Sequence, residues 1–219
     1  MIHEAFPLKI FHKNSDIDHT YIIKEMFDTM GDNTSVTDPT WHKEKGYSSW
    51  IKYFWADNQY YGKAHLNPAF KEITDFVNNC VIEYQEDLGL DISIQEIKCT
   101  SSYLNFHDKT TSTYLHDHEG AVIAGTYYIL MEGNCPELSF YNPLTVPFKG
   151  VHPWNTAKFK KDWKEEISFR PVAGDLFLWP GDILHGVESN GAWYERYFLN
   201  MGFHFFSDKV PNFPPLIVD

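Results

Sequence analysis

Three histidines have a spacing that would let their side chains meet around one metal ion. His116 and His118 are two residues apart in the run TYLHDHEG, at the end of a predicted strand. Residues two apart in an extended chain point to the same face, so both imidazoles can reach one cation. His185 follows a turn in the later run GDILHGVES and can add a third nitrogen ligand. The pattern predicts a metal site made of His116, His118 and His185.

Arg196 begins the next predicted strand, in the run RYFLNMGFHFF. A ferrous site that activates dioxygen uses three protein ligands on one side of the metal, which leaves positions for dioxygen and a bidentate co-substrate. A guanidinium can hold a carboxylate through two parallel charge-assisted hydrogen bonds. The histidines and Arg196 together therefore indicate a ferrous site that uses a dicarboxylic keto acid.

Helices and strands are both needed to position these residues. Asn67 can cap a helix that begins at Pro68, and apolar residues recur at helical spacing before Gly89. A shorter helix is expected before Gly31. From residue 92 onward, short runs rich in β-branched and aromatic residues are separated by Gly, Pro, Asn and Asp. These runs are ISIQEIKCTSSYLNF, AVIAGTYYILM, ELSFYN, ISFRPV, DLFLWP and RYFLNMGFHFF. Such spacing predicts a β-sandwich or barrel with helices packed on one sheet.

Composition excludes several classes of function. The net charge of −12 argues against a broad contact with nucleic acid, which needs many Lys and Arg residues. The three cysteines lack C-x-x-C spacing, so neither a disulfide framework nor a thiolate zinc site is expected. No apolar run is long enough to span a membrane and the start of the chain lacks a signal-peptide pattern, so a cytoplasmic protein is expected.

Further motifs accompany these residues in a fixed order. They are GTYYI from Gly125, NCPELSFYNP from Asn134, GDLFLWP from Gly174, LHGV from Leu184 and Glu195-Arg196. With His116-x-His118 before them and the opening run FPLKIF, this order resembles the 2-oxoglutarate/iron(II) oxygenases, in particular a branch found in bacteria and phages. The resemblance covers most of residues 90–206.

The resemblance implies a mainly β fold with flanking helices, a double-stranded β-helix of the jelly-roll, cupin-like type. It also implies Fe(II) and 2-oxoglutarate as cofactors, and a reaction that decarboxylates 2-oxoglutarate to succinate and hydroxylates a C–H bond. By this resemblance His116, His118 and His185 would hold Fe(II), and Arg196 would anchor 2-oxoglutarate. Tyr128 would assist on the same carboxylate, with Asn105 as a further candidate.

The third place of the motif leaves the ligand set open. The usual family motif is His-x-Asp or His-x-Glu, whereas this chain has His118. Three neutral ligands leave more positive charge on iron, and Asp117 or Glu119 could offset it by accepting an imidazole N–H. Alternatively, Asp117 or Glu119 coordinates directly in place of one histidine. The eight other histidines, His107 and His204 among them, are interpreted as structural or solvated, with His107 near the mouth of the site.

Two other functions also stay open. A cupin-like metal enzyme without 2-oxoglutarate would share the barrel and the ligands but would not need Arg196. A non-catalytic jelly-roll binding protein would carry the histidines incidentally.

For each of these functions we expect one domain over residues 1–219, with residues 1–90 as a supporting layer and 91–219 as the β-helix core. We expect a small-molecule or peptide substrate and no membrane partner, and a homodimer stays open.

Overall fold

The structure is a computed structural model of the 219-residue chain. The structure describes residues 8–30, 47–48, 62–90, 96–107, 113–132, 135–143, 166–187 and 198–207.

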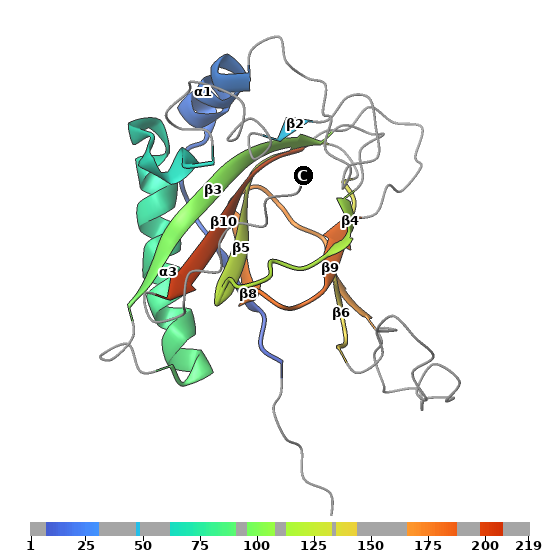
Figure 1. The fold of residues 1–219 in the computed structure, drawn as a ribbon. Helices are drawn as coiled ribbons and strands as arrows, with labels where there is room; N and C mark the ends of the chain where they lie inside the picture. Colours follow the sequence, from blue (N-terminus) through green and yellow to red (C-terminus); the bar gives the residue numbers. More distant parts are fainter. Residues whose placement is uncertain are drawn as a thin grey trace, which may run out of the picture.

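Two antiparallel β-sheets face each other (Figure 1). The major sheet has the strand order β1 (Phe11–Asn14), β8 (Asp175–Pro180), β5 (Ile123–Met131), β10 (Phe198–Ser207), β3 (Ile97–His107) and β2 (Tyr47–Ser48). The minor sheet has the order β4 (Thr113–His116), β9 (His185–Val187), β6 (Leu138–Tyr141) and β7 (Glu166–Phe169). All six strand runs expected after residue 92 therefore contain strands, and the expected mainly β sandwich is confirmed.

Two helices cover the outer face of the major sheet, on the side away from the minor sheet (Figure 1). The helix α1 (Thr20–Met30) begins after Asp18, whose Oδ1 accepts a hydrogen bond from the Thr20 N–H. Asn67 caps a 3-10 turn, η2 (Pro68–Phe70), which follows the turn η1 (Ala64–Leu66) and leads into α3 (Lys71–Leu88). The expected long helix is thus present, with a tighter first turn.

The layer between α3 and the sheet is apolar. The helix contributes Ile73, Val77, Cys80, Val81 and Tyr84, all buried. A left-handed Gly89, with φ of 74°, ends the helix. No helix in the described ranges is both long and apolar enough to cross a lipid bilayer.

Strands β5 and β8 separate the two cores of the molecule. Ile123, Tyr127 and Ile129 belong to the helix-side core, whereas Ala124 and Tyr128 belong to the core between the sheets. On β8, Leu176 and Leu178 alternate in the same way with Phe177 and Trp179. Because side chains alternate along a strand and both faces here are covered, these strands are apolar almost throughout. The face toward the minor sheet is the one that can hold a functional site.

Candidate metal centre

His116 and His185 meet because they are paired across two strands of the minor sheet. They are directly opposite in the antiparallel pairing of β4 with β9, and their ring centroids are 4.3 Å apart. Phe140 of β6 pairs with His185 on the other side. The buried His185 is therefore fixed between two neighbouring strands, while His116 occupies the end of an edge strand.

His118 lies beyond the end of β4, not within the strand as the spacing predicted. Its backbone N–H donates to the Gly181 carbonyl at 2.7 Å, and its own carbonyl accepts from Ala121 at 3.0 Å. A turn therefore delivers the His118 ring, with centroids 5.0 Å from His116 and 4.8 Å from His185. The three rings therefore meet, although His118 lies two residues past the end of the strand.

Gly181 makes this turn possible because a side chain there has no space. A Cβ atom at Gly181 would lie 2.2 Å from the backbone oxygen of Ala121. Gly181→Ala is therefore expected to push the turn that carries His118 away from β8. We expect a loss of about 1–3 kcal/mol in unfolding free energy, as for overpacked sites, together with weaker metal binding. Urea unfolding and Co(II) titration of the same samples measure the two effects.

Gly89→Ala is the matched control for that variant. Gly89 adopts a left-handed conformation, which costs an alanine about 1–2 kcal/mol, but it lies at the end of α3, where a Cβ atom would meet nothing within 4 Å. It should lower stability without changing Co(II) affinity. Equal Co(II) affinity in both variants would contradict the role given to Gly181.

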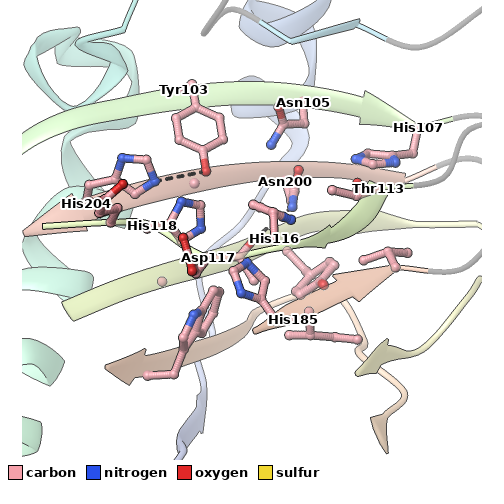
Figure 2. A pocket seen from close by; sticks show the side chains of 18 of the residues that line it. Tyr103, Asn105, His107, Thr113, His116, Asp117, His118, His185, Asn200 and His204 are labelled. Carbon is pink, nitrogen blue, oxygen red and sulfur yellow. Dashed lines mark hydrogen bonds between the residues drawn. The ribbon is translucent and has the colours of Figure 1, made fainter. Parts of the chain in front are cut away.

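The three histidines form a group that could hold a metal ion. One ligand atom from each of His116, His118 and His185 can be chosen so that all lie within 4.8 Å of one another (Figure 2). The group contains neither Asp117 nor Glu119, both of which are exposed at the same cavity. The arrangement brings together the three predicted ligands and leaves the two carboxylates beside them.

Two of the rings are oriented by backbone carbonyls. The Nδ1 atom of His116 is 2.8 Å from the Tyr114 oxygen, and Nδ1 of His185 is 2.9 Å from the Ile183 oxygen. Because a carbonyl oxygen only accepts, Nδ1 of each ring carries the proton and Nε2 keeps its lone pair. Such an outer hydrogen bond is what metal-ligating histidines usually make.

Burial, with the neighbouring imidazoles, favours the neutral form of His185 and His118 by lowering the pKa of each ring. Burial, and then the neighbouring His116, lower the pKa of His185 to about 3. Burial also lowers the pKa of His118 well below its ordinary value, and the imidazoles of His204, His185 and His116 lower it further. Neutral imidazoles are the form that binds a metal, so these rings need lose no proton near neutral pH.

A cavity of about 360 Å³ opens between the sheets beside the three rings. Asn105, Tyr128 and Asn200 line it from three neighbouring strands of the major sheet, where Asn200 is the direct pairing partner of both other residues. Burial raises the pKa of Tyr128 well above its usual value, so its hydroxyl stays protonated and can donate. The two residues proposed to assist the co-substrate, Asn105 and Tyr128, are thus both at the cavity.

Several buried polar atoms of the cavity have no hydrogen-bond partner among the described residues. They are Oδ1 of Asn105, Oδ1 of Asn200 and Nε1 of Trp179. Buried polar atoms are nearly always paired in native proteins, so a cavity with such atoms is suited to a polar ligand. Three neutral nitrogen ligands beside a cavity of this size fit a ferrous ion with a small organic co-substrate.

Arg196, the predicted anchor of that co-substrate, lies outside the described residues.

Two histidines that the sequence analysis interpreted as structural or solvated, His107 and His204, are buried and line the cavity. The alternation of side chains along a strand could have identified His204, because it lies on the same face of β10 as Asn200 and Gly202, which also line the cavity. That signal was missed because neither histidine has a partner nearby in the sequence.

A protein-family model matches residues 101–200 of this chain, and the family is described as "Putative 2OG-Fe(II) oxygenase". The matched segment contains His116, His118, His185, Asn105 and Tyr128. No curated protein matches the chain.

Solved structures share the fold at low sequence identity. A prolyl-4-hydroxylase from Pseudomonas putida is 11% identical, with a TM-score of 0.53 over 90% of this chain and 92% of that one. A prolyl hydroxylase from Trichoplax adhaerens, in complex with a hypoxia inducible factor peptide, is 14% identical, with a TM-score of 0.56 over 90% and 83%. HygX from Streptomyces hygroscopicus, with nickel, 2-oxoglutarate and hygromycin B bound, is 11% identical, with a TM-score of 0.52 over 90% and 83%. The double-stranded β-helix expected from the sequence is confirmed.

Proposed function

We propose that this chain, whose residues 101–200 match the model of a family described as "Putative 2OG-Fe(II) oxygenase", is a 2-oxoglutarate-dependent hydroxylase with His116, His118 and His185 as its iron ligands. The convergence of these three side chains supports the proposal most directly, because their ligand atoms come within 4.8 Å of one another. They come from β4, the turn after it and β9, so their meeting depends on the fold and not on sequence proximity alone.

The residues around the metal position have separable tasks. Fe(II) bound there would supply the activation of dioxygen, with 2-oxoglutarate giving two electrons as it becomes succinate and carbon dioxide. One oxygen atom would enter succinate and the other would form the hydroxyl group of the product. The Nδ1 contacts of His116 and His185 hold the two rings in the tautomer that leaves Nε2 for the metal. The rings of Phe140 and Trp179 pack against His185, with their centroids 6.1 and 4.6 Å from the centroid of its ring. These apolar rings limit the access of water to His185 from that side.

The co-substrate would lie along the inner face of the major sheet. In this proposal Arg196 binds its distal carboxylate, and the protonated Tyr128 hydroxyl and the Asn105 amide donate to the same end. The unpartnered Oδ1 of Asn105 supports this assignment, since an amide can turn to present its nitrogen instead. Asn200 is a further candidate for that contact, because it is paired with both residues.

The substrate is proposed to be a peptide or a small molecule. Two similar folds were solved with such partners, a hypoxia inducible factor peptide in one and hygromycin B in the other. Among the described residues that line the cavity, the only charged groups apart from histidine are the exposed Asp117 and Glu119. A neutral or cationic substrate therefore suits the described part of the cavity better than an anionic one.

Anaerobic addition of Fe(II) and 2-oxoglutarate tests the proposed function. We expect stoichiometric iron binding and a weak visible charge-transfer band that requires both components, because 2-oxoglutarate would coordinate the metal through two oxygen atoms. Admission of dioxygen should then release succinate. Tight iron binding without the band would favour a cupin-like metal enzyme that does not use 2-oxoglutarate. Failure to bind iron would contradict the proposed function and favour a non-catalytic binding protein.

A further inference from the structure

His118 is held in a different way from the other two proposed ligands. His116 and His185 each have a ring nitrogen bonded to a backbone carbonyl. Within the part of the chain that the structure describes, the His118 ring makes no hydrogen bond of this kind. A metal-ligating ring usually needs an outer partner to fix its rotation, so something else has to restrain His118.

His204 provides the close contact on His118. Their ring centroids are 4.1 Å apart with an interplanar angle of 48°, which is the shortest ring-to-ring distance that His118 makes among the described residues. The side chain of His204 is buried in the middle of the major sheet, on β10. Because protein interiors are close-packed, a ring in this position limits how far the His118 imidazole can rotate.

His204 is itself fixed at both ring nitrogens. Its Nδ1 is 2.9 Å from the Ser101 hydroxyl oxygen, and its Nε2 is 3.2 Å from the Tyr103 hydroxyl oxygen (Figure 2). Both nitrogens are therefore engaged by hydroxyl groups of β3. His204 is also absent from the group of histidines whose ligand atoms converge. It is thus placed to support a ligand and not to be one.

The backbone is shaped to permit this arrangement. Tyr103 reaches His204 by lying over Gly202, where a Cβ atom would be 2.5 Å from Cζ of the Tyr103 ring and 2.8 Å from its hydroxyl oxygen. The pairing of β10 with β3 shifts by one residue between His204 and Phe205. Such β-bulges redirect side chains and are common beside functional sites. A residue larger than glycine at 202 would displace Tyr103 from its bond to His204.

We infer that His204 is a positioning residue for His118, with its ring, fixed by Ser101 and Tyr103, restraining the His118 imidazole by packing in place of a hydrogen bond. The inference rests on the proposed function, because it requires His118 to bind a metal. A restrained imidazole keeps its nitrogen on the metal, whereas a rotating one would give way to Asp117 or Glu119, which flank it in the chain.

Co(II) titration of His204 variants tests the inference without any turnover. His204→Ala removes the packing and should weaken Co(II) binding about 10-fold, the lower end of the loss usual for an outer partner, and change the visible Co(II) spectrum. His204→Phe keeps a ring but loses both hydrogen bonds, and should stay within about 3-fold of the wild type. His65→Ala is the matched control, because His65 bonds to Ser102, the neighbour of Ser101 on β3, and does not line the cavity. Thermal unfolding of each variant reports its stability.

A double-mutant cycle separates positioning from a general structural role. If His204 acts through His118, removing His118 first leaves it nothing to position, so His118→Ala and His118→Ala/His204→Ala should bind Co(II) equally well. Additive losses would overturn the inference, as would an unchanged affinity and spectrum in His204→Ala. Equal weakening in His204→Ala and His204→Phe would also overturn it, because packing would not be the cause. If the wild-type protein binds neither Co(II) nor Fe(II), the proposed function fails and the inference fails with it.

Discussion

Replacing His185 by alanine is expected to abolish succinate release and to weaken Fe(II) binding by more than about 100-fold. Loss of an outer hydrogen-bond partner already costs about 10- to 100-fold in metal affinity, and loss of a direct ligand should cost more. Two ligands would remain, and His185 is the central ring of the group, since it packs on His116, His118 and Trp179. Equilibrium dialysis with Fe(II) under anaerobic conditions measures the affinity, and succinate release in air measures turnover.

His12→Gln is the matched control for the His185 variant. His12 lies on β1, outside the cavity, and its Nε2 contacts Oδ1 of Asp175 at 2.9 Å, a bond that a glutamine N–H can also make. We expect iron affinity and succinate release to stay at the wild-type level. Iron binding by His185→Ala that matches the wild type would show that a different set of ligands holds the metal, and Asp117 or Glu119 would then be the next candidates.

Local sequence signals predict the elements of this fold well. The helix before Gly89 follows from a capping Asn67, a proline at the first helical position and a regular apolar stripe, which act within a few residues of one another. The strands of the major sheet can be recognised in the sequence because helices cover one face of the sheet and the minor sheet covers the other. Ile123–Met131 and Asp175–Pro180 are therefore almost continuously apolar.

The candidate site was predictable to the extent that its residues lie at the ends of recognisable strands. His116 follows from that rule, whereas His185 was predicted only as a residue that follows a turn, and its place at the start of β9, opposite His116, is seen only in the folded chain. The geometry of His118 was not predictable, because it depends on a turn docked on Gly181, a contact that only the folded chain contains. His204 was missed for the same reason: its importance comes from a ring contact across the barrel, and nothing adjacent in the sequence marks it.

Arg196→Ala is expected to raise the dissociation constant for 2-oxoglutarate by about 30- to 1000-fold while Fe(II) affinity changes little. Removing one partner of a buried, hydrogen-bonded charge pair costs about 2–4 kcal/mol, which converts to that range of affinities. Arg196 lies outside the described residues, so the prediction depends on its place in the motif order and on the cavity residues Asn105 and Tyr128. Titration of the anaerobic Fe(II) protein with 2-oxoglutarate, followed by the charge-transfer band, measures the constant.

The arginine variant also decides between two interpretations of the same metal site. Arg170→Ala is the matched control, because Arg170 is exposed and pairs with Glu137 at 3.0 Å on the surface, where a lost ion pair has little effect. A cupin-like enzyme would use the three imidazoles without an anchor for a distal carboxylate, and its metal site would not respond to Arg196. Equal 2-oxoglutarate affinity in the wild type and Arg196→Ala would therefore contradict the anchor role of Arg196, and the proposed histidine site would be unaffected by that result. Weakened 2-oxoglutarate binding with unchanged Fe(II) binding requires both groups in one cavity, as the oxygenase needs.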